Sequence, residues 1–260
     1  MKIQFYKCNA NGNTFIIVLH NNNLPNNFLT IKKIKSYCLK SSGELVDGLI
    51  VLNIKNKSFF MDYYNNDGTW ETLCLNGLRC ASLLIFNKLK IKNISIICNE
   101  IVYKTTIMKD DYVKVELSKP IYKLNNLKVV NLIGDFIDSG AKHFVIKYDK
   151  EWSKNKNLEE ISKKIRYNSS LFPEGTNVNF YKIINKNKIQ VKTYEKGVES
   201  MMNSCASGSF ACAYDYSNKE KVLGDIEVVN DGGNFIMSFN KNYKESTLIG
   251  KAEIEYKGIL

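Results

Sequence analysis

The sequence predicts an α/β (α+β) protein with two similar domains, each a curved, mostly antiparallel β-sheet around a central helix. Short runs in which polar and apolar residues alternate dominate the chain, as in half-buried antiparallel strands. Few convincing helices interrupt them. The order of elements in the first half returns in the second: strands, a peripheral helix, more strands, then a polar turn and a helix that follows a cysteine. This repeat indicates two domains of one design.

The individual elements follow from the same patterns. Strands are expected at residues 3–8, 14–19, 48–54, 58–64, 94–99, 113–118, 142–149, 178–184, 189–195, 225–230 and 252–258. Peripheral helices are expected at residues 31–39 and 158–166, and the other two helices follow Cys74 and Cys205. Both cysteine-led segments share the pattern Cys-x-Asn/Ser-Gly, then Ala and apolar residues. They are the expected central helices.

Composition narrows the class of protein. The 260 residues, 44% of them hydrophobic, suffice for one large domain or two of ordinary size. The net charge of +11 raises the possibility of a basic nucleic-acid-binding protein. Of the 37 Lys and Arg residues, however, only Arg79 and Arg166 are arginines, which nucleic-acid sites favour for bidentate contacts. The scattered lysines indicate a solvated surface, and no nucleic-acid partner is expected.

The apolar runs and the cysteines bear on location and on metals. No apolar run is long enough to span a bilayer, and the N-terminus lacks the apolar core of a signal peptide, so a cytoplasmic protein without membrane contact is expected. Seven cysteines without a Cys-x-x-Cys pair, and only two histidines, argue for free thiols and against zinc. Five cysteines have apolar neighbours and are expected in the core: Cys8, Cys38, Cys80, Cys98 and Cys212.

The other two cysteines, Cys74 and Cys205, suggest acid–base chemistry. A helix N-terminus carries unpaired N–H groups and about half a positive charge, which stabilise a thiolate and bind carboxylates. Gly77 and Gly208 would let the backbone approach a ligand closely. One such cysteine is as easily a small core residue, but two in matching contexts suit another task. Facing each other, two thiols can remove a proton from one face of a carbon and return one to the other.

Seven motifs support a more specific interpretation. They are NGNTF (11–15), NNDGTWETLCLNGLRC (65–80), GAKHFV (140–145), FPEGTNVNF (172–180), YEKG (194–197), SCASG (204–208) and EYKG (255–258). In their order and spacing the chain resembles the diaminopimelate epimerases, a cofactor-independent, two-cysteine family of amino-acid racemases and epimerases. The resemblance implies two pseudo-symmetric domains of that fold. Residues 1–115 with the returning segment 249–260 carry Cys74, and residues 116–248 carry Cys205.

The resemblance also implies the roles of particular residues. Cys74 and Cys205 match the family's catalytic acid and base, which work without pyridoxal phosphate or a metal. His143 and Glu195 match two groups that tune the pKa values of the thiols, and Glu195 also receives the substrate ammonium. The matching substrate-binding positions are Asn13, Asn65, Leu75, Asn76, Asn177, Glu195, Lys196, Ala206 and Ser207. Tyr256 lies at the position of a dimer contact, so a homodimer is expected.

The expected reaction is the interconversion of LL- and meso-2,6-diaminopimelate by an isomerase of lysine and cell-wall biosynthesis. Three departures from the family pattern bear on the substrate: Lys196 replaces an Arg that grips the distal carboxylate, Ala141 replaces an Asn, and Gly48 replaces a Gln. They leave open a related racemase of another amino acid, such as histidine. A catalytically dead homologue is disfavoured by the intact cysteine pair. The retained YEKG motif with Asn65 and Asn177 favours diaminopimelate.

Overall fold

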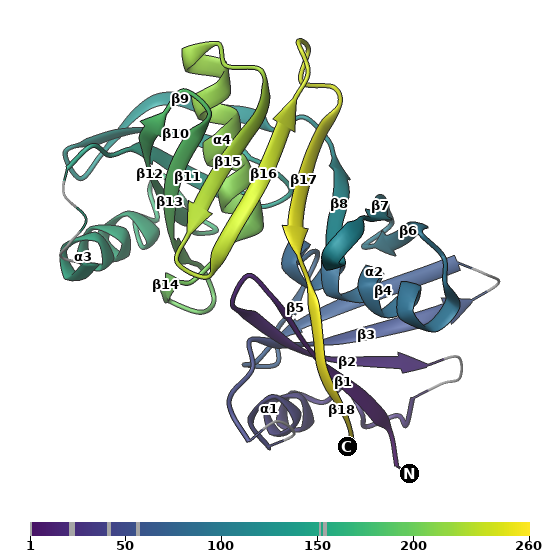
Figure 1. Ribbon diagram of the computed structural model, residues 1–260. Coiled ribbons are helices and arrows are strands. Elements are labelled where there is room, and N and C mark those ends of the chain that lie inside the picture. Colours follow the sequence, from purple (N-terminus) through teal and green to yellow (C-terminus); the bar gives the residue numbers. More distant parts are fainter. Residues whose placement is uncertain (1, 21–23, 41–42, 56–57, 151, 153–154) are drawn as a thin grey trace. The chain divides into compact units, whose positions relative to one another are not determined.

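The computed structural model describes residues 2–20, 24–40, 43–55, 58–150, 152 and 155–260 (Figure 1). By its internal contacts the chain divides into two compact units. Unit 1 comprises Met1–Glu116 and Ile249–Leu260, and unit 2 comprises Leu117–Leu248. The chain therefore leaves unit 1 once and returns to it with its last strand.

Over its described residues, unit 1 contains two helices and a mostly antiparallel set of strands. The strands are β1 (Gln4–Ala10), β2 (Asn13–His20), β3 (Gly48–Lys55), β4 (Ser58–Asn65), β5 (Trp70–Glu71), β6 (Asn93–Cys98), β7 (Ile101–Ile107), β8 (Tyr112–Leu117) and β18 (Glu253–Ile259). The helices are α1 (Ile31–Lys40) and α2 (Leu75–Leu89), with a 3-10 turn η1 (Lys109–Asp111). Strand β18 pairs antiparallel with β1, so the two ends of the chain meet in one sheet.

Unit 2 repeats this plan with its own elements. Its strands are β9 (Ile121–Val129), β10 (Leu132–Asp138), β11 (Lys142–Lys147), β12 (Asn177–Asn185), β13 (Lys188–Glu195), β14 (Ser200–Met202), β15 (Gly224–Asn230), β16 (Gly233–Phe239) and β17 (Ser246–Lys251), the last of which continues past the boundary of the unit. Its helices are α3 (Asn155–Arg166) and α4 (Ala206–Glu220).

Each described helix of unit 1 has a counterpart at the same place in the topology of unit 2. In unit 1, α1 connects the parallel pair β2 and β3, and α2 connects the parallel pair β4 and β6. In unit 2, α3 connects β11 and β12, and α4 connects β13 and β15, again as parallel pairs. Parallel neighbours need a crossover of a dozen or more residues, usually a helix, whereas antiparallel neighbours that follow each other in the chain, such as β1 and β2, are joined by a turn. Each unit thus consists of hairpins linked by two helical crossovers.

The two kinds of helix differ in burial. Residues around the whole circumference of α2 are buried from Leu75 to Ile85, and α4 is buried in the same way over most of its length. A helix buried on every side is enclosed by its domain, and Figure 1 shows α4 behind β15 and β16. Helices α1 and α3 place one apolar face on the sheet: Ile34 and Cys38 join the core of unit 1, and Leu158 and Ile165 that of unit 2.

This architecture confirms the predicted α/β class, with central helices that begin after cysteines. Helix α1 begins where predicted and extends one residue further, to Lys40, and α3 begins three residues before the expected start at residue 158. Strands that the sequence did not predict are β5, β7, β9, β10, β14, β16 and β17. Strand β9 shows why, because nearly all of its side chains are exposed or half-buried and the apolar alternation is therefore weak.

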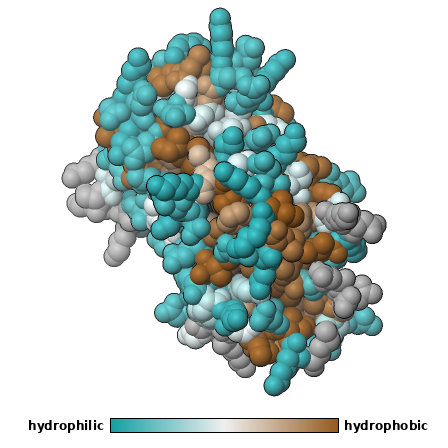
Figure 2. Space-filling model, turned by 45° about the vertical axis from the view of Figure 1, so that its right-hand side comes forward, coloured by the Kyte–Doolittle hydropathy of each residue, from teal (hydrophilic) through white to brown (hydrophobic). Residues whose placement is uncertain are grey.

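The surface carries many hydrophilic side chains with apolar areas between them on the face seen in Figure 2. The five cysteines that the sequence predicted for the core are all buried. All seven cysteines are free thiols. Within the described ranges, no helix has the combination of length and apolar character that crossing a bilayer requires.

Candidate active site

The two cysteine-led helices begin with nearly identical geometry. Cys74 is the N-cap of α2 with φ −131° and ψ 110°, and Cys205 is the N-cap of α4 with φ −127° and ψ 110°. Each helix has 15 residues and ends at a lysine in the left-handed conformation, Lys90 or Lys221. The carbonyls of both cysteines accept the first intrahelical hydrogen bond. Both cysteines thus cap a helical first turn, whose N–H groups stabilise nearby negative charge.

In unit 1 a backbone amide already points at the sulfur. The Sγ of Cys74 accepts a hydrogen bond from the backbone N–H of Gly77 at 3.4 Å. A Cβ at Gly77 would lie 2.6 Å from Cδ1 of Ile50 and 3.6 Å from Cβ of Cys74. The glycine lets the first turn pack closely against strand β3 while its amide serves as the cap donor.

A buried amide network connects this first turn to the β1–β2 turn. Asn11 and Gly12 both have positive φ, as the central residues of a type I′ hairpin turn require, and this tight turn places Asn13 at the start of β2. The Nδ2 of Asn76 donates to Oδ1 of Asn13 at 2.7 Å. Arg79 lies one turn further along α2, and its Nη2 donates to Oδ1 of Asn76 at 2.8 Å and to Oδ1 of Asn11 at 3.1 Å.

Arg79 is a buried cation whose charge acts on Cys74. Its side chain is fully buried, and burial lowers the pKa of Arg79 to about 10, while attraction to Cys80 and Cys74 opposes that shift. The guanidinium therefore stays charged at neutral pH. The attraction is mutual, so the cation favours negative charge on the Cys74 sulfur.

In unit 2 a different network reaches the cysteine. The Sγ of Cys205 lies 3.5 Å from Oγ of Ser207, and that hydroxyl lies 3.1 Å from Nε2 of His143 on β11. The other ring nitrogen, Nδ1, lies 3.0 Å from Nδ2 of Asn179 on the neighbouring strand β12. Oδ1 of Asn179 accepts from the hydroxyl of Thr193 at 2.9 Å.

The imidazole in this network is uncharged at neutral pH. His143 is completely buried, and burial lowers its pKa to about 4, although Asn179 and the charge of Asp138 oppose the shift. Gly208 packs against the same network: a Cβ there would clash with Oδ1 of Asn179 and lie 3.0 Å from Oγ1 of Thr193. The glycine of the second cysteine motif is therefore required by its polar neighbours.

Glu195 is the last residue of β13, and Lys196 opens the turn to β14. The backbone N–H of Lys196 donates to Oδ1 of Asn177 at 2.9 Å, and Nδ2 of Asn177 donates to the carbonyl of Lys142 at 3.1 Å. Asn177 thus fastens the turn to strand β11. Glu195 is half-buried, and the Lys196 side chain is exposed.

A charged cluster fixes the far side of the same turn. Both Nε and Nη2 of Arg166 donate to Oε1 of Glu199, at 3.2 and 2.9 Å. The Tyr167 hydroxyl and the Gly197 N–H also donate to this carboxylate, at 3.0 and 3.1 Å. Glu199 itself has a positive φ of 56°, which is uncommon for a residue with a side chain. The end of α3 therefore sets the conformation of the segment that carries Lys196.

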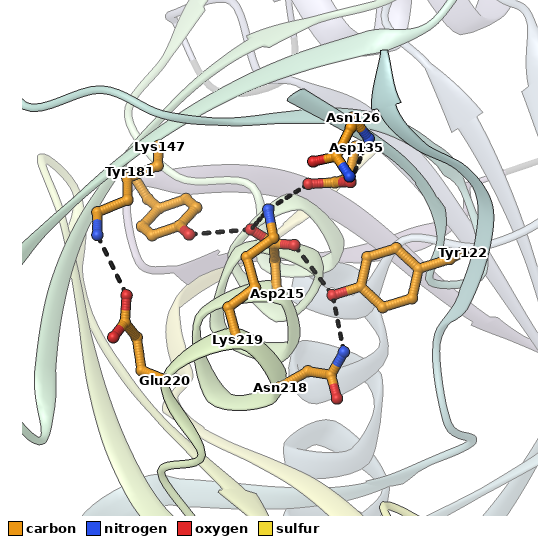
Figure 3. Close-up of polar contacts among 9 residues, drawn as sticks. All are labelled: Tyr122, Asn126, Asp135, Lys147, Tyr181, Asp215, Asn218, Lys219 and Glu220. Carbon is orange, nitrogen blue, oxygen red and sulfur yellow. Dashed lines mark hydrogen bonds and ion pairs between the residues drawn. The ribbon is translucent and has the colours of Figure 1, made fainter. Parts of the chain in front are cut away.

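The second half of α4 is held by a buried ionic cluster (Figure 3). The carboxylate of Asp215 is fully buried and accepts from the hydroxyls of Tyr122 and Tyr181 at 3.0 and 2.9 Å. Lys219 bridges Asp215, at 3.1 Å, and the buried Asp135 on β10. Burial raises the pKa of Asp215, and the Lys219 charge opposes that shift. These contacts fix the axial position of the helix whose other end presents Cys205.

The remaining predicted positions lie as follows. Leu75 and Ala206 are buried first-turn residues, so only their backbone N–H groups suit a ligand. Asn65 is buried, and its side chain donates to Oγ1 of Thr69 at 3.1 Å. Gly48 pairs with Asn65 in the sheet, and a Cβ there would lie 2.5 Å from the ring of Tyr63. This packing is a steric reason for glycine at position 48.

Two supporting residues were not predicted from the sequence. Arg79 carried a signal, because it is one of only two arginines in a lysine-rich chain. Asn179 carried no such signal, because isolated asparagines are common in this sequence and nothing in the local pattern sets this one apart from the others. Among the residues that the structure describes, no group of three or more His, Cys, Asp or Glu side chains is arranged to hold a metal ion.

Comparison with known proteins identifies the family. The sequence model of the diaminopimelate epimerase family matches residues 136–255. The diaminopimelate epimerase of Chlorobaculum tepidum is 30% identical over 96% of this chain and 98% of its own length. That of Aquifex aeolicus is 29% identical over 99% of this chain and 98% of its own.

Solved structures share the fold at low identity. A hydroxyproline epimerase from Agrobacterium vitis has a TM-score of 0.77 and 10% identity, covering 100% of this chain and 92% of its own. A predicted epimerase from Pseudomonas aeruginosa has a TM-score of 0.74 and 7% identity, covering 99% of both chains. Likeness at this level concerns the fold alone, whereas the full-length identity to Chlorobaculum tepidum concerns the family. The predicted resemblance is thereby confirmed: the chain belongs to the diaminopimelate epimerase family.

Proposed function

We propose that the protein is a diaminopimelate epimerase, an isomerase that interconverts LL- and meso-2,6-diaminopimelate with Cys74 and Cys205 as its acid–base pair. The observation that carries the proposal is the matched geometry of the two cysteines, each the N-cap of a buried 15-residue helix. Family membership supports the substrate. Neither thiol needs a metal or pyridoxal phosphate to move a proton, so the proposed enzyme uses no cofactor.

In the proposed mechanism the two thiols act on opposite faces of one α-carbon. One cysteine, as thiolate, removes the α-hydrogen, and the other, as thiol, delivers a proton to the opposite face. Negative charge that develops on the α-carboxylate is stabilised by the first-turn N–H groups of α2 and α4. The side chain of Glu195 receives the substrate ammonium. In the reverse direction the cysteines exchange roles.

Substrate reach depends in this proposal on the β13–β14 turn. Lys196 is exposed on that turn and would contact the distal carboxylate of diaminopimelate with one charge rather than with a bidentate fork. The pKa of the Glu174 carboxyl is lowered mainly by Lys142 and, to a smaller extent, by the charge of Lys196. Lys196 therefore already acts electrostatically on one carboxylate, that of Glu174. Asn13, Asn65 and Asn177 complete the proposed polar contacts.

The proposed enzyme is a cytoplasmic homodimer with a contact at Tyr256. This side chain on β18 is 40% exposed, and its ring packs edge-on against Phe5 with centroids 6.2 Å apart. The ammonium of Lys7 lies 5.8 Å from the ring centroid. Tyr256 is thus a partly exposed aromatic side chain on an ordered support, the kind of residue that interfaces favour. Sedimentation of the parent and of Tyr256→Glu tests this contact.

The test of the function is exchange of the α-hydrogen in deuterated water. Diaminopimelate, lanthionine, histidine, lysine and glutamate are compared, and only diaminopimelate is expected to exchange and to change configuration. Cys74→Ala and Cys205→Ala should each lose the interconversion, because each direction needs both an acid and a base. Exchange of histidine alone would instead establish the related racemase. Full activity in either alanine variant would refute the two-thiol mechanism.

A further inference from the structure

The buried contacts around His143 fix which of its ring nitrogens carries the hydrogen. Nδ2 of Asn179 donates to the carbonyl oxygen of Phe144 at 3.4 Å, and its Oδ1 accepts from the hydroxyl of Thr193. Both contacts orient the amide so that its nitrogen, and not its oxygen, faces the imidazole. The nitrogen can only donate, so Nδ1 of His143 is the acceptor in the 3.0 Å contact.

A neutral imidazole with Nδ1 as acceptor carries its hydrogen on Nε2. That nitrogen therefore donates to Oγ of Ser207 at 3.1 Å. A hydroxyl that accepts from one neighbour has its own hydrogen left for another, and the Sγ of Cys205 lies 3.5 Å away. The hydroxyl of Ser207 is therefore oriented to donate to the sulfur.

We propose that Asn179 is a positioning residue that fixes the tautomer of His143 and so directs a chain of hydrogen-bond donors at Cys205. The chain runs from Thr193 through Asn179, His143 and Ser207 to the sulfur, and its first three members are fully or almost fully buried. Donors aimed at a sulfur favour the thiolate over the thiol. His143 acts in it as a neutral donor and not as a base.

The assignment applies to one cysteine only. Cys74 in unit 1 has the Gly77 amide and the buried Arg79 cation near it, whereas Cys205 has this side-chain relay. The two thiols are thus supported by different chemistry, although the backbone angles of the two N-caps are nearly the same. The catalytic meaning of the relay rests on the function proposed above, but the relay itself can be measured without substrate.

The first experiment determines the tautomer directly. The intact protein is labelled with ¹⁵N-histidine, and the nitrogen shifts of His143 are recorded at pH 7, with His20→Gln to assign the only other histidine. A neutral ring with hydrogen on Nε2 is expected. Hydrogen on Nδ1, or an imidazolium, overturns the proposal, because the amide of Asn179 would then not be a donor to the ring.

The second experiment measures the two sulfurs separately. The protein is alkylated with iodoacetamide across a range of pH, and peptide mass spectrometry follows Cys205 and Cys74 in one sample. Asn179→Leu and Ser207→Ala are each expected to slow labelling of Cys205 at pH 7 about tenfold, the lower end for a hydrogen bond to a charged group, and to leave Cys74 unchanged. Ser207→Thr keeps the hydroxyl and should restore the rate.

The relay at Cys205 and the proposed epimerase function can fail independently of each other. Unchanged labelling of Cys205 in Ser207→Ala, which removes only a hydroxyl from a half-buried side chain, overturns the relay. An equal loss at Cys74 and Cys205 means a general structural effect and also overturns it. A protein that fails to epimerise diaminopimelate but shows the expected tautomer and labelling refutes only the function.

Discussion

Nη2 of Arg79 donates to Oδ1 of Asn76 at 2.8 Å, and this contact turns the Nδ2 of Asn76 toward Asn13. An arginine has only donors, so its place in the network dictates the orientation of the amide beside it. Asn76 in turn orients Asn13, because Oδ1 of Asn13 accepts the hydrogen bond from Nδ2 of Asn76. The side-chain nitrogen of Asn13 then remains available to donate to a bound carboxylate.

Replacement of Arg79 by leucine should therefore affect both stability and binding. It removes one hydrogen bond from the buried Asn76, at a cost of about 1–3 kcal/mol, and one from the half-buried Asn11, where water can replace the lost donor at a smaller cost. Urea denaturation measures the free energy of unfolding, and the KM for diaminopimelate should rise with it. Arg79→Lys keeps the charge without the two-acceptor fork, so it should recover only part of the loss. An unchanged urea midpoint for Arg79→Leu would contradict the role of this network.

His143 predicts a loss of stability in mild acid. Its folded-state pKa of about 4 lies below the 6.5 of an exposed histidine, so between these values the unfolded chain binds a proton that the folded protein does not. The free energy of unfolding is unaffected by this group above pH 6.5 and falls as the pH drops toward 4, by about 3 kcal/mol.

The measurement compares the pH dependence of the unfolding free energy in three proteins. His143→Gln should lose this part of the slope, and His20→Gln should keep it. Equal slopes in the parent and in His143→Gln would show that His143 takes up its proton in the folded state as readily as in the unfolded chain.

The two glycines of the cysteine motifs should respond differently to alanine. At Gly208 the new methyl group meets the fixed polar side chain of Asn179, whereas at Gly77 it meets the flexible end of Ile50. Gly208→Ala should destabilise the fold by about 1–3 kcal/mol, as overpacking does, and slow the reaction at Cys205. Gly77→Ala should cost less, because a side-chain terminus moves more easily than a hydrogen-bonded amide. Thermal unfolding of both variants measures the two losses of stability. A larger loss in Gly77→Ala than in Gly208→Ala would contradict this prediction.

Lys219 should matter far more than a neighbouring lysine on the surface. Lys219→Met leaves Asp215 and Asp135 buried without their cation, at about 2–4 kcal/mol, below the loss for a fully buried pair because water screens the half-exposed ammonium. Lys147 pairs with Glu220 at 3.2 Å with both side chains solvent-accessible, so Lys147→Met should change stability by less than about 0.5 kcal/mol. Equal urea midpoints for the two variants would mean that the buried cluster adds nothing.

Lys196 tests the reach of the proposed substrate site. Lys196→Ala should weaken diaminopimelate binding by about 1.5–3 kcal/mol, the range for a hydrogen bond to a charged group. Lys196→Arg offers bidentate geometry and should bind at least as tightly as the parent. Isothermal titration with diaminopimelate measures both variants. If the alanine variant binds and turns over diaminopimelate normally, the distal carboxylate lies elsewhere and a monocarboxylic substrate becomes the better hypothesis.

The helix starts were predictable because their causes are local. Each cysteine opens the pattern Cys-x-Asn/Ser-Gly ahead of an apolar segment. This pattern predicted a helix start, and the structure shows both cysteines as N-caps. The hydrogen-bond directions around Asn179 were not predictable, because they depend on Phe144 and Thr193, which reach it only through strand pairing. Strand β9 was missed because its exposed side chains leave little apolar alternation to detect.

The pairing of β18 with β1 has a consequence for synthesis on the ribosome. Asn9 and Glu255, which share a hydrogen bond of 3.2 Å, are 246 positions apart in the chain. Unit 2 is continuous from Leu117 to Leu248, so once that segment has emerged only the end of its last strand, β17, is still to come. Unit 1 must leave an edge of β1 exposed until the last strand is made, although its other strands are translated first. The nascent chain thus inverts the usual order, in which the N-terminal domain is completed before the one that follows it.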